Sequence, residues 1–339
     1  MATLQAPSQF LPEREVLSQP GAALSARPFL PADAHEWDAL VRSSINGTFM
    51  HTRRFISYHG ERFDDCSVVF TDENGALVGV LPAAVDPGDQ AACFSHPGLT
   101  YGGIVHDGSL QGERMEQAML LSIDLFRLQG RQRLRYKAVP YIYHRSPAQD
   151  DLYWLHRLGG VRYRCDLSAT IDLDRRAKVS PLRRRNIRRA ERAGLAVVDS
   201  AANLPRFWDL LELVLAERHR VHPVHSLAHI QLLAQRFPEE VRCIVAEEAG
   251  ELVAGSVLFV TETVVHAQYY ASSPRGRQLR ALDLVIEHSI ELTRELGRRY
   301  YDLGVSTPNG GRELNDGLSR YKTSFGAGCT VYECYELRL

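Results

Sequence analysis

One order of predicted elements occurs twice in this chain, and the repeat restricts the fold more than any other feature. Apolar runs on either side of a turn at Gly75 are typical of a β-hairpin. A second such pair surrounds Gly250, 175 residues further along. Each hairpin leads into a segment that contains tyrosine with glycine or serine, residues 101–103 and 269–273, which we predict to be loops. The two halves therefore share a supersecondary unit.

Each loop leads to an amphipathic helix and then to another strand. Apolar residues at helical spacing predict helices that stop at Gly130 and Gly297, which lie 167 residues apart. Glycine is the usual residue at a left-handed helix stop. Strands at 134–137 and 300–303 follow. We predict an α/β (α+β) fold with two copies of one unit, each a mixed, mostly antiparallel sheet flanked by helices. The alternative is two unrelated α/β domains.

Two more helices flank this frame, and neither carries chemistry of its own. Residues 29–43 and 204–218 each place apolar side chains along one stripe, with Asp33 as an N-cap of the first helix. The 16 prolines include four in the first 28 residues, where no apolar core of a signal peptide is found, so residues 1–27 are expected to be a loose tail.

Composition excludes several classes of protein. A length of 339 residues fits two domains, and a formal net charge of −1 gives no global field that marks a nucleic-acid binder. No run approaches the roughly 20 apolar residues that a membrane span needs. The six cysteines form no CxxC pair, which favours free thiols in a reducing cytoplasm, with a single catalytic cysteine as the open alternative.

Three local patterns resemble the FemABX and FemAB-related proteins. The first is Asn-Gly-Thr-Phe-Met-His at 46–51, followed by Phe55 and Tyr58. The second is the arginine-rich segment 183–194, which contains Arg-x-Asn-x-Arg-x-Ala and ends in glycine. The third is 302–326, with Asp-Leu-Gly, then Leu-Asn-Asp-Gly-Leu, then Tyr-Lys and Phe-Gly. Together the last two patterns are fairly specific, whereas each alone is weak.

The resemblance spans about residues 29–339 and implies a fold and an activity. It implies two tandem GNAT-like domains, 28–160 and 161–325, with a C-terminal strand at 326–339 that returns to the first domain. Proteins of this family join an acyl or aminoacyl group to an amine. The implied partners are a donor carrier, tRNA above all, and a small-molecule or peptide amine acceptor. The oligomeric state is left open.

A basic segment is the sharpest physical signal in the sequence. Four arginines share one face of a predicted helix: Arg185, Arg188, Arg189 and Arg192. Like charges at this spacing repel one another, and the arginine fork suits phosphate. We predict a contact with phosphate or a tRNA backbone, and the alternative is a solvated basic helix.

The catalytic candidates are Lys322, Asp302 and Tyr270. A lysine flanked by Tyr321 and Phe325 can be partly desolvated and can stabilise a developing oxyanion, the role that the resemblance implies. The alternative is a surface lysine packed on aromatic rings. Asp302 can orient the amine or accept its proton, or else cap a turn. Tyr270 can donate to the acyl carbonyl or be a core residue.

The remaining candidates for substrate binding are Tyr101, His59, Tyr269, His222, His225 and Tyr321. On a strand, Tyr269 and Tyr270 point to opposite faces, so only one of them faces a given pocket. His59 stands where some cell-wall enzymes of the family have a lysine that holds a substrate diphosphate, which argues against a nucleotide-linked acceptor. The histidine spacing around His222 matches no strong zinc pattern, so we expect no metal.

The donor is the open question. CoA-dependent GNAT enzymes carry a glycine-containing loop that cradles pyrophosphate, and the equivalent segment here, 275–281, lacks glycines in register. Arg277 and Arg280 can still bind phosphate through their side chains. We therefore expect aminoacyl-tRNA as cosubstrate and no tightly bound cofactor. The alternatives are an acyl-CoA or acyl-carrier-protein donor, and a non-catalytic double-GNAT binding module in cell-envelope or exopolysaccharide assembly.

Overall fold

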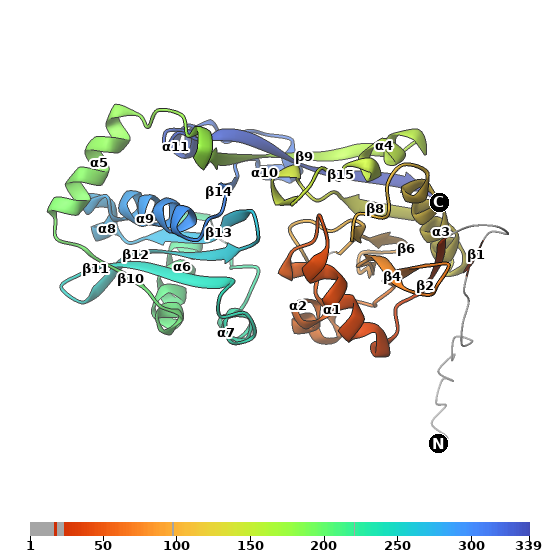
Figure 1. Ribbon diagram of the computed structural model, residues 1–339. Helices are drawn as coiled ribbons and strands as arrows, with labels where there is room; N and C mark the ends of the chain where they lie inside the picture. The colour runs from red at the N-terminus through yellow and green to blue at the C-terminus, as the bar shows by residue number, and fades with distance from the viewer. Residues whose placement is uncertain (1–16, 19–23, 97, 220) are drawn as a thin grey trace, which may run out of the picture.

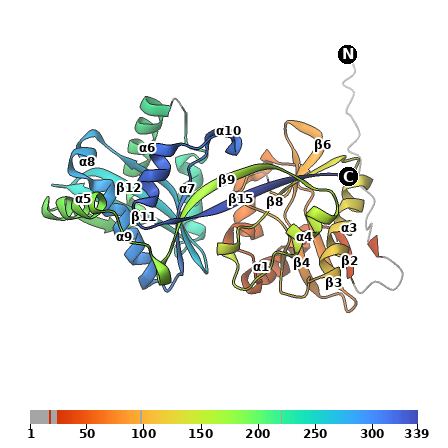
Figure 2. The same ribbon diagram turned by 90° about the horizontal axis from the view of Figure 1, so that it is seen from above.

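The computed structural model has two lobes joined by two long strands, β9 (Val161–Asp172) and β15 (Gly328–Arg338) (Figures 1 and 2). The described part of the chain comprises residues 17–18, 24–96, 98–219 and 221–339. The two long strands pair with each other in antiparallel fashion over most of their length. They continue the sheet of one lobe into the other, so the lobes are linked by strand pairing as well as by the continuous chain. No described helix is long and apolar enough to cross a membrane.

A five-stranded antiparallel sheet belongs to the first lobe alone. Its strands are, in spatial order, β1 (Leu17–Ser18), β2 (Leu24–Pro28), β3 (Val68–Asp72), β4 (Leu77–Leu81) and β7 (Val105–His106). Helix α3 (Glu113–Leu128) closes the core over this sheet, because its buried Met115 and Phe126 share one apolar cluster with Leu24 and Phe70. This core is the interior of the first lobe.

A ten-stranded sheet runs through both lobes. Its order is β10 (Ala196–Asp199), β11 (Val241–Glu248), β12 (Glu251–Val260), β13 (Val264–Ser272), β14 (Tyr300–Val305), β9, β15, β8 (Arg133–Lys137), β6 (Asp89–Phe94) and β5 (Ala84–Asp86). All pairs in the described sheets are antiparallel except two, β6 with β8 and β13 with β14. Each lobe therefore contains one parallel pair.

Helices cover both faces of the second lobe. The helices besides α3 are α1 (Ala34–Ser43), α2 (Arg53–Ile56), α4 (Asp150–Arg157), α5 (Pro181–Arg192), α6 (Leu204–His219), α7 (Leu227–Arg236), α8 (Pro274–Leu279), α9 (Ala281–Glu295), α10 (Pro308–Gly311) and α11 (Asp316–Thr323). Helix α9 packs on one face through Val285 and Ile290, and α6 packs on the other through Phe207 and Trp208. Helices α5 and α8 lie at the end of this lobe that is remote from the first lobe (Figures 1 and 2).

The structure confirms the predicted α/β fold built from a repeated unit and most of the predicted elements. Both hairpins form, as β3–β4 and β11–β12. Both helices stop at a left-handed glycine, with φ of 75° at Gly130 and 66° at Gly297. The domain limits 28–160 and 161–325 stay a prediction, although the last strand does pair with β8 of the first lobe.

Three local expectations were wrong. Residues 269–272 belong to β13 and are not a loop, because they pair with β12 up to its end. Residues 24–27, predicted as loose tail, are strand β2 and pair with β3, and residues 17–18 pair with β2; the rest of that tail lies outside the described residues. Asp33 precedes α1 but does not cap it, since its carboxylate pairs with Arg27 and accepts from the Leu30 amide.

Candidate functional site

The two parallel strands of the second lobe part in the middle of the sheet. Strands β13 and β14 pair only through Val264–His266 and Tyr300–Asp302. Each strand then carries one extra residue relative to its other neighbour: β13 bulges against β12 at Gln268, and β14 bulges against β9 just after Asp302. Bulges bend strands and are frequent next to active sites. We call the opening beyond His266 and Asp302 the second-lobe split.

Asp302 stands at the vertex of this split and is fully buried. Its carboxylate accepts hydrogen bonds from six groups: Ser168, Thr170, Tyr143, Tyr332, His266 and the Gly304 amide. Burial by itself raises the pKa of Asp302, but the hydrogen bonds from His266, Ser168 and Tyr332 outweigh burial and hold this pKa at about 2. A carboxylate so stabilised and saturated is a poor proton acceptor, so the geometry speaks against direct base catalysis by Asp302.

His266 is the partner that the sequence did not reveal. Its Nδ1 lies 2.9 Å from Asp302 Oδ2. Because an ionised carboxylate only accepts, Nδ1 carries the hydrogen, and in the neutral ring the lone pair is on Nε2. The side chain is 10% exposed, and Nε2 makes no hydrogen bond to the described residues, although it is not an entirely buried atom. Asp302 and His266 thus form a dyad in which the carboxylate fixes the ring.

Lys322 lies on the other side of the same split. Its Nζ is buried and donates to the carbonyls of Gly304 (2.8 Å) and Val305 (2.7 Å). Burial lowers the pKa of Lys322 to about 8, while the charge of Asp302 acts in the opposite direction. An ammonium has three donors, so one N–H remains. The expectation that this lysine is desolvated is met, and it is no surface lysine.

Gly304 separates the two groups. Its φ of 78° is left-handed, and a β carbon placed there would stand 3.7 Å from the His266 ring and 3.9 Å from Lys322 Nζ. His266 and Lys322 therefore face one small space from two sides. Tyr270 borders it as well, because its ring centroid lies 5.8 Å from Lys322 Nζ.

Tyr321 has a different place from the one predicted. Its hydroxyl donates to Asp283 in the first turn of α9, and Arg183 pairs with the same carboxylate. The guanidinium of Arg183 also lies over the rings of Tyr321 and Phe325. This buried ion pair fastens α5 to α9 and α11, the helix that carries Lys322, so Tyr321 supports the site and does not line it.

The predicted basic face of α5 is fully presented to solvent. Arg183, Asn186, Ile187 and Ala190 form the buried side of the helix. The exposed arginines are Arg184, Arg185, Arg188, Arg189 and Arg192, and none of them makes an ion pair with a described residue. Like charges crowded without counter-charges favour an anionic partner.

The segment equivalent to a CoA pyrophosphate loop is folded as the short helix α8. The Gly276 amide donates to Ser273, and a β carbon at Gly276 would overlap the Val253 carbonyl, so this glycine serves packing. Arg277 donates to the Ser272 carbonyl, whereas Arg280 is exposed. The first turn of α9 contains an acid, Asp283, whose carboxylate is bonded to Arg183 and Tyr321.

A cavity of about 260 Å³ is lined by residues of both lobes, among them Gln268, the bulge residue of β13. His225 bridges it: one ring nitrogen contacts Tyr58 (3.1 Å), and the other contacts Tyr269 (2.7 Å). His59 also lines this cavity, and its role in substrate binding stays a prediction. His222 is exposed and lies outside the lining.

Tyr101 was expected in a ligand-binding loop, but the structure buries it. Its hydroxyl donates to Thr48, and its ring packs on Tyr143 with centroids 4.4 Å apart. Tyr143 is one of the donors to Asp302, so Tyr101 supports the dyad from the first lobe.

In the described part of the chain no group of three His, Cys, Asp or Glu is placed to bind a metal, and the six cysteines are free.

The sheet with its split is that of a GNAT-like fold, and comparisons with known proteins agree. The acetyltransferase (GNAT) domain family matches residues 182–323, which contain the split, Lys322 and the basic helix. Across the whole chain the fold is that of tandem GNAT proteins. No curated protein matches the sequence.

Solved structures resemble both lobes together. FemX matches with a TM-score of 0.66 at 13% identity, over 93% of this chain and 97% of that one. L-PGS from Bacillus licheniformis matches with a TM-score of 0.59 at 13% identity, over 90% and 91%. A tandem GNAT protein from the clavulanic acid biosynthesis pathway gives 0.52 at 15% identity, over 93% and 98%. The predicted resemblance to FemABX-type double-GNAT proteins is therefore confirmed at the level of the fold.

Proposed function

We propose that the chain is an amide-forming acyltransferase that takes an aminoacyl group from aminoacyl-tRNA and transfers it to an amine. The observation that carries this proposal is the exposed arginine face of α5, on the helix that Arg183 fastens to the helix of Lys322. A tRNA whose sugar–phosphate backbone lies on that face can deliver its acylated end toward the split. The solved structures named above add support, since they include FemX and L-PGS from Bacillus licheniformis.

The second-lobe split supplies the chemistry. The amine attacks the ester carbonyl, a C–N bond forms, and the carbonyl oxygen takes the negative charge, which the remaining N–H of Lys322 stabilises. His266 accepts the amine proton at Nε2 and passes it to the leaving ribose oxygen as the C–O bond breaks. Asp302 holds the ring in the required tautomer. The acceptor lies in the inter-lobe cavity, with its amine near Gln268.

An acyl-CoA donor is the second candidate, and two observations weigh against it. The first turn of α9 carries an acid, Asp283, and the Gly276 amide of α8 is already bonded to Ser273. A non-catalytic module is the third candidate. It offers no reason to bury a lysine and a His–Asp dyad around one space, because buried charges are costly unless they serve a purpose.

The test is donor specificity. Purified protein is incubated with a pool of charged tRNAs or with a panel of acyl-CoA thioesters, with and without ribonuclease, and deacylation is measured in the presence of amines. We expect ribonuclease-sensitive loss of the aminoacyl ester. Cleavage of CoA thioesters that does not respond to ribonuclease would overturn the proposal.

Charge reversal on α5 tests the docking surface. Arg188→Glu with Arg192→Glu should raise the KM for tRNA and flatten the salt dependence, by about 0.9 in log–log slope for each lost phosphate contact. The matched control is Arg157→Glu with Arg338→Glu, two exposed arginines on α4 and β15 that make no ion pair with a described residue. Equal effects of the two pairs would show a general charge effect and contradict the docking surface.

A further inference from the structure

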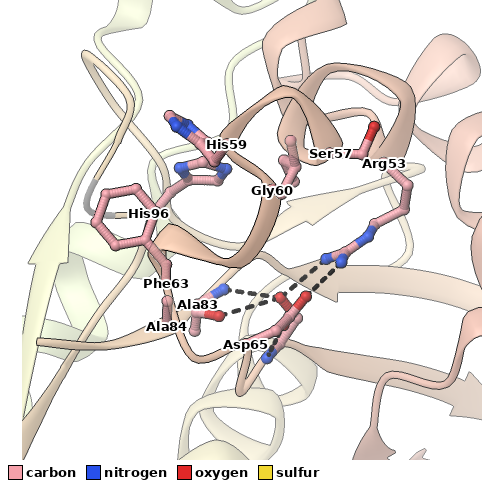
Figure 3. A pocket seen from close by; sticks show the side chains of 11 residues that line it. Arg53, Ser57, His59, Gly60, Phe63, Asp65, Ala83, Ala84 and His96 are labelled. Carbon is pink, nitrogen blue, oxygen red and sulfur yellow. Dashed lines mark hydrogen bonds and ion pairs between the residues drawn. The ribbon is translucent and has the colours of Figure 1, made fainter. Parts of the chain in front are cut away.

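Two carboxylates of this chain are held in different ways, and the difference bears on His266. In the first lobe, Asp65 lies on a cavity of about 330 Å³ and forms an ion pair with Arg53, which lines the same cavity (Figure 3). Asp302 is fully buried and forms no ion pair with an arginine or lysine among the described residues. An ionised carboxylate without a counter-ion draws a proton strongly onto a neighbouring imidazole. His266 would then stay protonated and be lost as a base, unless other groups share the charge of Asp302.

The two oxygens of the Asp302 carboxylate have different partners. Oδ1 accepts from two hydroxyls of β9 and from the Gly304 amide. Oδ2 lies 2.9 Å from His266 Nδ1, and the same oxygen accepts from the hydroxyl of Tyr332. Each donor on Oδ2 takes up part of its negative charge. Tyr332 therefore competes directly with the imidazole for this one oxygen.

Tyr143 supports Tyr332 in this contact, and we call these two residues the tyrosine pair. The Tyr143 hydroxyl oxygen lies 2.8 Å from that of Tyr332 and 3.3 Å from Asp302 Oδ2. Both side chains are buried, and burial raises the pKa of both hydroxyls well above the ordinary value, so they remain protonated donors. A hydroxyl that accepts one hydrogen bond donates the next one more strongly. The tyrosine pair therefore acts on Oδ2 as one unit.

Neither member of the tyrosine pair belongs to the segment 182–323 that matches a GNAT domain. The first ends a short 3-10 helix, Tyr141–Tyr143, that follows β8 of the first lobe, and the second lies in β15. Thr263, in the turn between β12 and β13, donates to the Ile142 carbonyl at 2.7 Å and so fastens this short helix to the strand that carries the dyad histidine. Parts of the chain outside the GNAT-like segment thus complete the dyad.

Other titratable groups also feel the charge of Asp302. It acts on Lys322 of α11 and on three further tyrosines, Tyr270, Tyr301 and Tyr101. Lys322 donates to two backbone carbonyls and forms no ion pair with this carboxylate. Of the six groups that hydrogen-bond to the carboxylate, only the tyrosine pair and the dyad histidine are ionisable side chains. The tyrosine pair is therefore the part of this environment that a single substitution can weaken without removing the dyad.

We propose that Tyr332, supported by Tyr143, is a positioning residue that limits the pull of Asp302 on the proton of His266. The imidazole keeps its Nδ1 hydrogen bond and its orientation, while Nε2 stays free of a proton until the amine delivers one. The first lobe and β15 thereby set the basicity of a group in the second lobe. The inference rests on the proposed function in one respect, namely that His266 acts as the base.

The test is the titration of the His266 ring in the full chain, followed by NMR of carbon-13-labelled histidine. The resonance that is lost in His266→Asn identifies the ring. Tyr332→Phe removes the donor and keeps the shape of the side chain, so the midpoint of the titration should rise by about one pH unit. The acid limb of the single-turnover rate should move with it, and Tyr143→Phe should raise the midpoint by a smaller amount. An unchanged or lowered midpoint in Tyr332→Phe would overturn the proposal.

Two controls separate this role from the general effect of losing a buried hydroxyl. Tyr136 donates to the buried Asp151 in the first lobe at 2.7 Å, so Tyr136→Phe is the matched change away from the dyad and should leave the midpoint in place. Tyr332→3-fluorotyrosine supplies a stronger donor of nearly the same size and should lower the midpoint. This variant also keeps the test open if Tyr332→Phe does not fold. An equal rise in Tyr136→Phe, or a midpoint that 3-fluorotyrosine does not lower, would contradict the assignment.

The titration needs no acyl donor, so it is independent of the transfer assay. A shifted midpoint without any ribonuclease-sensitive transfer would refute only the proposed function. Normal transfer with an unshifted midpoint would refute only this inference.

Discussion

The two parallel strand pairs begin in the same way and end differently. In the first lobe, β6 pairs with β8 over Ala92–Phe94 and Arg133–Arg135, and in the second lobe β13 pairs with β14 over three residues as well. Beyond that point the first pair is closed by its own chain: Gly102 donates to the Lys137 carbonyl, and Lys137 donates to the carbonyls of His96 and Leu99.

The second pair has no such closure. Among the described residues no backbone hydrogen bond joins β13 to β14 beyond His266 and Asp302, and side chains fill the opening instead. Lys322 takes the carbonyls of Gly304 and Val305, much as Lys137 takes carbonyls in the first lobe. The difference is that side chains can move or exchange partners when a substrate arrives, whereas a bonded loop cannot. The duplicated unit therefore has one half suited to chemistry and one half that its own chain closes.

The largest effect is expected at the His–Asp dyad. His266→Asn keeps a donor for Asp302 but removes the second ring nitrogen, so single-turnover transfer at saturating acceptor should fall by about 10²–10⁴, the usual contribution of a general base. The KM for tRNA should stay constant.

The first lobe supplies the control for the dyad. Asp151 is also buried and accepts from a tyrosine, Tyr136, next to the closed pair. Asp151→Asn should leave the chemical rate of the folded protein unchanged. If His266→Asn transfers at the normal rate, the dyad is structural and the contrast between the two lobes disappears.

Local patterns predicted the frame of the molecule but only part of the site. Hairpins and glycine stops follow from neighbouring residues, and so they were found. The dyad was missed because its contacts are remote in sequence: Asp302 meets Ser168 across 134 positions and Tyr143 across 159. His266 itself lies in an apolar strand, where a histidine is usually a core residue. The one available signal was its place within Val-Val-His-Ala, which a single glutamine separates from the two tyrosines.

The sequence did locate Lys322 and the arginine face, for different reasons. A lysine between two aromatic rings can be judged from its neighbours, and helical spacing places Arg185, Arg188 and Arg192 on one face. The sequence could not separate these exposed arginines from the arginines that form ion pairs within the fold. Arg176 pairs with Glu287 and Arg183 with Asp283, and both acids come from α9, about 100 residues later.

The two lysines give the next largest effect. Lys322→Met removes the donor to the developing oxyanion, and the chemical rate should fall by about 10²–10³. Lys137→Met should retain the chemical step, because Lys137 binds carbonyls in the first lobe and not at the split. Rapid-quench measurements of single turnovers separate the two outcomes. Equal losses of chemical rate in both variants would contradict the division of roles.

The pH profile sharpens this comparison. Lys322 has a pKa lowered to about 8, so its ammonium is present below that pH and is lost above it. The chemical rate should therefore decline as the pH rises through about 8. Lys322→Arg stays charged, and whatever activity it retains should lack this decline. A decline of the same midpoint in the arginine variant would assign it to another group.

The smallest effect concerns the space in each opening. A β carbon at Gly102 would overlap the Ser95 carbonyl, so Gly102→Ala should lower the free energy of unfolding by about 1–3 kcal/mol through overpacking. At Gly304 the nearest atoms stand 3.7 Å away, so Gly304→Ala should cost only the left-handed strain of about 1–2 kcal/mol, yet it should impair transfer because the methyl group enters the space between His266 and Lys322. Urea denaturation and single-turnover rates measure both variants. If Gly304→Ala transfers normally while Gly102→Ala does not, the open half of the duplication is the first lobe and the roles argued for the two strand pairs are reversed.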